Sequence, residues 1–137
     1  MAGAFDRVDT ARFLAKLASK GLPQNFLALF AVRRAFVEIN GVASSEYALC
    51  NSLFQGTVFG PVLWNTFMED SGDATSSAGF TDVTYADDLN AFKRFPVTTS
   101  NATLLDHCRR CRDNLHAWGA ATWVQWEQPK ESSHVTA

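Results

Sequence analysis

The sequence lacks the features that mark membrane and secreted proteins. It contains no apolar run of the roughly eighteen residues that a membrane-spanning helix needs. Its first residues do not show the charged and apolar regions of a signal peptide. The cysteines number three, and an odd count without a secretory signal indicates reduced thiols. We therefore expect an intracellular protein of the cytoplasm or nucleus, with no membrane contact and no disulfide partner.

The sequence also lacks an excess of basic residues. Lysine and arginine total 12 against 14 acidic residues, for a net charge of −2. This balance excludes a strongly basic nucleic-acid-binding surface, so any such contact would need a local site or basic parts outside this chain. The 137 residues are 47% hydrophobic and 19% charged, which is typical of a globular protein. Without repeats or linkers, they predict one domain over residues 1–137.

Apolar residues recur every three to four positions in several segments, which predicts helices with one buried face. These segments are Val8–Lys20, Pro23–Phe30, a helix that starts at Pro61, and Asn101–Trp118. Asp9 or Thr10 is the expected cap of the first helix, and Ser100 or Asn101 that of the last. Gly21 and Gly119 stand where helices commonly end.

Other segments predict strands or loops. Ala35–Ile39 and a return strand within Val42–Leu49 flank Asn40-Gly41, a strong hairpin signal because both residues tolerate positive φ. Ser71–Gly79 is small and polar, which predicts a surface loop. Trp123–Trp126 predicts a short strand, and residues 127–137 a frayed tail. Before the hairpin, Arg33 and Arg34 suit either a solvated strand entrance or a phosphate contact.

The stretch Phe80–Phe92 carries two adjacent carboxylates, Asp87 and Asp88, between two runs rich in β-formers. It predicts a strand, a tight turn with both acids, and a return strand. Adjacent side chains on a strand point to opposite faces, whereas a turn lets both approach one site. Carboxylate oxygens are the ligands that Mg²⁺ prefers. Metal-assisted phosphoryl chemistry and a merely solvated turn are both compatible with this stretch alone.

A larger, ordered set of motifs surrounds these acids. Along the chain come Ala4-Phe5-Asp6, a helix, a hairpin, Gln55-Gly56 with Gly60-Pro61 and Asn65, Tyr85-Ala86-Asp87-Asp88, and Trp118 followed by Pro129-Lys130. In this order they resemble the palm of a non-LTR (LINE-type) retrotransposon reverse transcriptase. Each motif alone is weak, but the ordered set is specific and covers nearly the whole chain.

The resemblance implies an α+β polymerase palm, an RRM/ferredoxin-like antiparallel sheet backed by the Val8–Lys20 and Asn101–Trp118 helices, without fingers or thumb. It implies that Asp87 binds catalytic Mg²⁺, for which Mn²⁺ can substitute, with Asp88 assisting beside it. The reaction would be two-metal nucleotidyl transfer. The partners in the intact enzyme would be an RNA template, a DNA primer and deoxynucleoside triphosphates.

The resemblance assigns roles to other residues too. Gln55 and Gly56 resemble the loop that lies against template and incoming nucleotide, where a missing Cβ allows close approach. Tyr85 joins them as a substrate- and template-binding residue. Lys130 resembles the lysine proposed to protonate the pyrophosphate leaving group. A solvated lysine in a polar tail is the equally weighted alternative.

One departure from the family pattern concerns the metal site. The family's other metal-binding Asp lies on a strand just before the Ala-Phe-Asp step, and that position falls before Met1. Asp6 matches the position that starts the following helix, where a capping role fits better than a ligand role. Octahedral Mg²⁺ needs ligands from more than one direction. We therefore expect this chain, expressed alone, to be inactive.

Other interpretations have weaker support. Cys108 and Cys111 suggest zinc or redox chemistry, but no second cysteine pair exists, and both fall on the apolar stripe of the last helix, which favours core thiols. His116 and His134 show no arrangement for hydrolysis. Three other functions stay open: a catalytically dead palm-derived nucleic-acid-binding or interaction module, a cyclase-like metal-binding domain on a similar scaffold, and a decayed element.

Overall fold

The computed structural model describes residues 8–31, 33–49 and 57–135. Asp6, Gln55 and Gly56 lie outside these ranges. The chain divides into two compact units at the boundary between Phe67 and Met68, so a single domain stays a prediction. Helices and antiparallel two-stranded sheets occur together, which confirms the α+β class for the described residues.

The unit before the boundary is built on helices α1 (Thr10–Ser19), α2 (Gln24–Ala31) and α3 (Gly60–Met68). Its core is aromatic, since Phe13 packs at ring-centroid distances of 6.2 Å from Phe30 and 6.4 Å from Phe67. The buried apolar side chains of this unit are Val8, Phe13, Leu17, Leu27, Leu63, Trp64 and Phe67. Burial of such large side chains is the main stabilising contribution to a unit of this size.

Helix α1 begins and ends where the sequence predicted. The Asp9 carboxylate accepts a hydrogen bond from the Arg12 amide at 2.8 Å, which satisfies one of the unpaired N–H groups at the helix start. At the other end Gly21 has φ +82°, and the amides of Gly21 and Leu22 donate to the carbonyls of Ala18 and Leu17. This pair of bonds is the Schellman motif, in which glycine takes the left-handed conformation at no steric cost.

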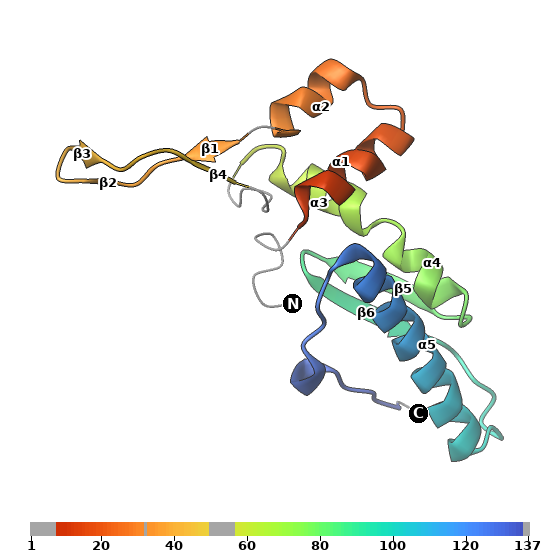
Figure 1. Cartoon of the computed structure of the whole chain (residues 1–137). Helices are drawn as coiled ribbons and strands as arrows, with labels where there is room; N and C mark the ends of the chain where they lie inside the picture. The colour runs from red at the N-terminus through yellow and green to blue at the C-terminus, as the bar shows by residue number, and fades with distance from the viewer. Residues whose placement is uncertain (1–7, 32, 50–56, 136–137) are drawn as a thin grey trace. The chain divides into compact units, whose positions relative to one another are not determined.

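The predicted hairpin around Asn40-Gly41 is confirmed. It contains β1 (Arg34–Ala35), β2 (Glu38–Ile39), β3 (Val42–Ala43) and β4 (Tyr47–Ala48), with β2 paired to β3 and β1 to β4. Asn40 and Gly41 have φ values of 51° and 78°, as a type I′ turn requires. The ribbon extends away from α1, α2 and α3 as a two-stranded arm (Figure 1).

The arm contains a β-bulge between its two ladders. Ala35 pairs with Tyr47 and Glu38 with Ala43, so residues 36–37 on one strand lie opposite residues 44–46 on the other. Ser44 spans the irregularity, because its amide donates to the Val37 carbonyl at 2.8 Å and its hydroxyl accepts from the Val37 amide at 3.0 Å. The exposed apolar side chains of the arm are Phe36, Val37, Ile39, Val42 and Tyr47.

The two arginines before the arm have structural partners. The Arg33 guanidinium donates to the Thr10 hydroxyl at 3.1 Å, and partial burial lowers the pKa of Arg33. Arg34 forms an exposed ion pair with Glu46 at 3.1 Å. These contacts favour the structural interpretation of both residues, and a phosphate contact stays untested.

The unit after the boundary contains α4 (Ser71–Ser76), β5 (Thr81–Tyr85), β6 (Asp88–Phe92), α5 (Asn101–Thr122) and the 3₁₀ turn η2 (Gln128–Lys130). The prediction of a surface loop over Ser71–Gly79 is wrong. Helix α4 packs against α5 and β5, with Ser71 and Thr75 buried. The Asn114 amide on α5 donates to the Ala74 carbonyl at 3.3 Å. Tertiary contacts thus stabilise a helix that has no apolar periodicity of its own.

Helix α5 begins as predicted but ends later. The Ser100 hydroxyl accepts a hydrogen bond from the Thr103 amide at 3.2 Å, which confirms Ser100 as the cap. Gly119 does not end the helix. It is buried inside α5, which continues to Thr122 and ends at Trp123 in the left-handed conformation, with φ 64°. The predicted strand at Trp123–Trp126 is therefore wrong, because the chain leaves the helix through a turn.

The core of this unit lies between the β5–β6 hairpin and α5. Buried Ala78, Phe80 and Cys111 pack together, with Ala91, Phe95, Cys108 and Leu115 against them. Of the predicted apolar stripe on α5, Leu105 is exposed instead. Helix α1 belongs to the other unit, so its predicted place behind this sheet stays a prediction. Within the described residues, no helix has the length and apolar character needed to cross a membrane.

Candidate active site at the β5–β6 turn

The two adjacent carboxylates lie at the tip of a regular hairpin. Tyr85 pairs with Asp88, and the register runs on to Thr81 opposite Phe92. The connecting turn therefore consists of Ala86 and Asp87 alone, and Asp88 is the first residue of β6. The predicted strand–turn–strand is confirmed, with the correction that only Asp87 is a turn residue.

The turn contains a strained residue. Ala86 has φ 52°, a left-handed conformation that costs an L-residue with a Cβ about 1–2 kcal/mol. Glycine and asparagine are the usual residues at such a position. Strain of this kind is frequent where backbone geometry serves a binding site. The conformation fixes how Asp87 follows the end of β5.

The two faces of the hairpin have different surroundings. Paired residues share a face, so Tyr85 and Asp88 lie on the same face as Val83 and Asn90. This face is open, and the Tyr85 side chain is 81% exposed. On the opposite face, Asp82 accepts a hydrogen bond from the Thr75 hydroxyl of α4 at 2.7 Å. One face is therefore anchored to the helices and the other is available for contact.

Lys130 lies in η2, the 3₁₀ turn that follows α5. Its ammonium forms an ion pair with Glu127 at 2.7 Å. The hydrogen bond and charge of Glu127 are the main causes that raise the pKa of Lys130, and the charges of Asp87 and Asp88 raise it further. The partner of Lys130 in the structure is therefore Glu127, three residues before it.

The carboxylate oxygens of Asp87 and Asp88 are the type of ligand that a hard divalent cation prefers. Mg²⁺ is commonly held by one or two carboxylates, with waters and substrate phosphates in the remaining positions. Asp87 is half-buried and Asp88 exposed, on adjacent residues of one hairpin. In the described ranges there is no group of three or more His, Cys, Asp or Glu residues that could hold a metal ion. The fit is therefore to one side of a metal site.

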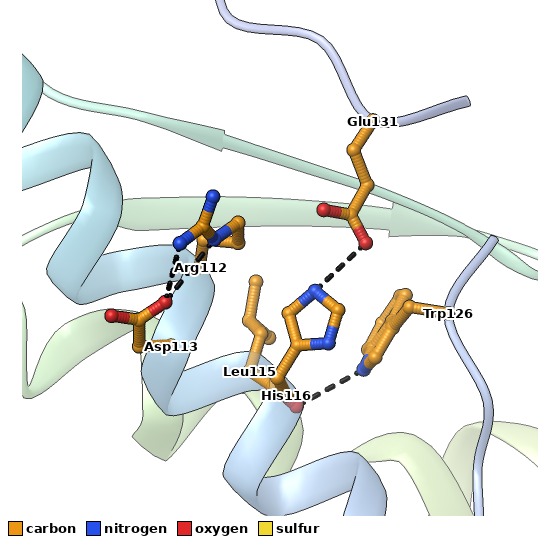
Figure 2. Close-up of polar contacts among 6 residues, drawn as sticks. All are labelled: Arg112, Asp113, Leu115, His116, Trp126 and Glu131. Carbon is orange, nitrogen blue, oxygen red and sulfur yellow. Dashed lines mark hydrogen bonds and ion pairs between the residues drawn. The ribbon is translucent and has the colours of Figure 1, made fainter. Parts of the chain in front are cut away.

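Sequence reasoning did not identify the contacts that attach the chain after α5 to that helix. The Glu131 carboxylate lies 2.8 Å from the His116 ring nitrogen, and Trp126 donates from its indole nitrogen to the Leu115 carbonyl at 3.0 Å (Figure 2). The spacing of Glu127 and Lys130, three residues apart, was a usable signal for their ion pair. No spacing in the sequence connects His116 with Glu131.

The cysteines of α5 are placed as core thiols. Cys111 is buried, and Cys108 is partly buried beside it; both are free. Burial raises the pKa of the Cys111 thiol, and the charges of Cys108 and Asp82 raise it further. A raised pKa keeps the thiol protonated and unreactive near neutral pH. Its burial confirms the prediction that Cys111 is a core residue.

Comparison with known proteins gives one family. Residues 1–123 match the family model described as reverse transcriptase (RNA-dependent DNA polymerase). No curated protein and no solved structure matched the chain. The match covers most of the 137 residues and includes the β5–β6 turn. This chain belongs to the reverse transcriptase (RNA-dependent DNA polymerase) family.

Proposed function

We propose that this chain is the palm of a non-LTR (LINE-type) retrotransposon reverse transcriptase and carries one side of its metal site. The observation that carries the proposal is the Tyr85-Ala86-Asp87-Asp88 turn, found at the tip of a helix-backed hairpin in a member of the family. The strained φ of Ala86 supports it, because nothing in hairpin folding requires alanine there.

Within this proposal, Asp87 and Asp88 would hold Mg²⁺, or Mn²⁺ in its place. The bound ion supplies charge stabilisation and nucleophile activation for phosphoryl transfer. The open face of the hairpin, with Tyr85 beside Asp88, gives substrate and template access to the carboxylates. Lys130, which is exposed and paired with Glu127, would be the proton donor to the leaving group. Gln55 and Gly56 keep their predicted roles at template and nucleotide.

The substrates in the intact enzyme would be an RNA template, a DNA primer and deoxynucleoside triphosphates. We also propose that the chain alone does not extend a primer. Asp87 and Asp88 come from one hairpin, and near-octahedral coordination needs ligands from more than one direction. A carboxylate from another element would complete the set.

Metal binding tests the site itself. Water-proton relaxation during a Mn²⁺ titration should show a weak site in the wild type that is lost in Asp87→Asn. Asp106→Asn removes an exposed carboxylate of α5 and serves as the matched control, with binding unchanged. Equal binding by wild type and Asp87→Asn would refute the assignment of the turn as a metal site.

Primer extension tests the second part of the proposal. With an RNA template, a DNA primer and either Mg²⁺ or Mn²⁺, the chain should incorporate no nucleotide. Robust incorporation that disappears in Asp87→Asn would overturn the proposal that this chain holds only part of the catalytic set, while establishing Asp87 as catalytic.

A catalytically dead interaction module is the second candidate. The observation that favours it is the hairpin arm, on which Ile39 is 67% and Val42 73% exposed beside the Asn40-Gly41 turn. Apolar side chains gathered on a projecting arm are typical of contact surfaces. Salt-dependent binding to a primer–template without incorporation, combined with no Mn²⁺ site at Asp87, would favour this module over the polymerase site.

A further inference from the structure

The arm exposes side chains on both of its faces. Phe36 is 54% and Val37 51% exposed, and Arg34 and Glu38 on either side of them are exposed as well. A two-stranded ribbon on its own is marginally stable at best in water. Contact with another chain would cover apolar surface that the arm alone leaves in water.

One edge of the arm is open to a further strand. β1 pairs with β4 and β2 with β3, and in the described ranges no other strand pairs with β1 or β2. The Arg33 carbonyl accepts from the Leu49 amide at 2.9 Å, and the Val37 backbone exchanges two hydrogen bonds with Ser44. Backbone groups of successive residues on a strand point to opposite sides. The residues whose backbone groups therefore point away from β3 and β4 are Arg34, Phe36 and Glu38. We call these three residues the outer edge.

The charges of the outer edge are opposite in sign and symmetric about Phe36. Arg34 lies two residues before Phe36, and Glu38 lies two residues after it. When two copies of this strand pair antiparallel with Phe36 opposite Phe36, each arginine lies opposite the glutamate of the other copy. Charges on an exposed strand commonly protect it from pairing with another strand. In this register the charges of the outer edge attract a second copy instead.

The backbone supports the same register. In an antiparallel pair, residues that exchange both backbone hydrogen bonds lie opposite each other, with Cα atoms about 5.5 Å apart. A pair centred on Phe36 brings all three residues of the outer edge into such positions, because their backbone groups point outward. Their side chains share one face, so two arginine–glutamate pairs flank the two phenyl rings. Cross-strand pairs of opposite charge and of aromatic rings both stabilise a sheet.

We propose that the outer edge binds a second copy of this chain, in an antiparallel pair centred on Phe36. The contact is isologous, since both copies use the same residues. Val37 of each copy lies opposite Ala35 of the other, which covers part of its apolar surface. Arg34 keeps its ion pair with Glu46 at 3.1 Å, because a guanidinium has five N–H donors and can bind two carboxylates. The proposal concerns the arm alone and does not depend on the metal site.

Sedimentation of the full chain at concentrations up to about 0.5 mM tests the proposal, because even a weak dimer is populated there. The contact is small, so we expect a concentration-dependent dimer of the wild type. Arg34→Glu and Glu38→Arg should each weaken dimerisation about tenfold, because the symmetry of the pair replaces two attractive contacts by two repulsive ones. Added salt should weaken the wild-type dimer, since both charges are exposed.

Mixing the two variants separates the interface from a general loss of structure. Arg34→Glu has only acidic charge on the outer edge and Glu38→Arg only basic charge, so a heterodimer of the two regains both attractive contacts. The mixture should dimerise about as well as the wild type, and so should the double variant Arg34→Glu with Glu38→Arg. Glu46→Gln is the matched control. It removes the ion pair that Arg34 forms within the chain and should leave dimerisation unchanged.

A disulfide tests the register itself. Phe36→Cys places two cysteines opposite each other, at a Cα separation of about 5.5 Å that a disulfide can span. Mild oxidation should link this variant into dimers, with the wild type as the background for the native cysteines. Ile39→Cys is exposed on the same strand, but its two copies would lie about 20 Å apart along the pair and should not be linked.

Four results would each overturn the proposal. They are a wild type that stays monomeric at every concentration, single variants that dimerise as well as the wild type, a mixture of the two variants that stays monomeric, and a disulfide in Ile39→Cys but not in Phe36→Cys. Dimerisation that follows the charges, together with a disulfide only in Phe36→Cys, would establish the pair.

Discussion

In the part of the chain that the structure describes, the β2–β3 and β5–β6 hairpins both reverse direction by two-residue turns, but different residue types take the positive φ. At the tip of the β2–β3 arm, positive φ falls on Asn40 and Gly41, which adopt it readily. At the β5–β6 tip, positive φ falls on Ala86, which adopts it at a cost. The first turn is therefore explained by hairpin folding alone. In the second turn the hairpin also requires positive φ at its first residue, but that residue is alanine, and the two carboxylates follow it directly.

The surroundings of the two hairpins also differ, because the arm is exposed and the β5–β6 hairpin is packed on one face. The arm carries exposed apolar residues on both strands, and its two ladders are short. The β5–β6 hairpin has a continuous five-residue ladder, and one face packs against Phe80, Cys111 and helix α4. A rigid scaffold of this kind can hold a strained turn in place. Packing thus stabilises the hairpin that carries Asp87 and Asp88.

Truncating one phenylalanine at each hairpin should give the largest difference in the free energy of unfolding. Phe80 is 9% exposed and packs against Phe95 at 6.5 Å, so Phe80→Ala should lower the free energy of unfolding by about 3 kcal/mol. Phe36 on the arm is 54% exposed, and Phe36→Ala should cost less than about 0.5 kcal/mol. Urea unfolding curves measure both. Equal losses would show that the arm packs as firmly as the β5–β6 hairpin.

Substitutions at the two turn residues with positive φ should show a smaller difference in the free energy of unfolding. Gly41 has φ 78° with no atom near an added Cβ, so Gly41→Ala should lower the free energy of unfolding by about 1 kcal/mol through backbone strain alone. Ala86→Gly removes such strain, but glycine raises the entropy of the unfolded chain, so its net effect should stay within about 0.5 kcal/mol. A loss in Ala86→Gly as large as that in Gly41→Ala would show that Ala86 is not strained.

The packed face behind β6 should also be visible in the chemistry of Cys111. Burial and then the neighbouring charges raise the pKa of this thiol, so it is protonated in the folded protein at pH values where the unfolded thiol ionises. Its contribution to stability is complete below the unfolded pKa, near 8.5, and declines as the pH rises through the higher folded pKa. Iodoacetamide should therefore modify Cys111 at pH 8.5 more slowly in the native protein than in urea.

Cys111→Ser keeps the size and removes the titrating thiol, so it should abolish this part of the alkaline decline in stability. The change in the free energy of unfolding should be small, because it comes from a single thiol. Native and urea-unfolded protein that react equally fast at Cys111 would contradict a closed face behind the hairpin.

The sequence predicted turns and helix ends that are determined by interactions between neighbouring residues. Asn40-Gly41 placed one hairpin, and the β-forming runs on either side of Asp87 placed the other. Gly21 and Ser100 placed helix ends, and the structure confirms both through φ +82° and a 3.2 Å capping bond. In each case the deciding interactions lie within a few residues, which is why they can be read from the sequence.

Features that depend on distant residues were not predictable. Helix α4 is stabilised by hydrogen bonds from the Thr75 hydroxyl to Asp82 and from the Asn114 amide to the Ala74 carbonyl. No local pattern in the sequence predicts these contacts. Glycine commonly ends helices, but Gly119 lies inside α5 and leaves room for the Trp126 indole. At the candidate site, Asp87, Asp88, Tyr85 and Lys130 were identified from the sequence. The contact between His116 and Glu131 was not, because these residues meet only through the reversal of the chain at Trp123.

We propose that the β5–β6 turn, unlike the β2–β3 turn, holds a divalent cation. Residue-resolved NMR with substoichiometric Mn²⁺ tests it most directly, because a bound paramagnetic ion broadens the amide signals around it. We expect early, selective broadening at residues 85–89, none at residues 39–42, and loss of the effect in Asp87→Asn. Broadening that spreads evenly over exposed carboxylates, or that persists in Asp87→Asn, would contradict the claim.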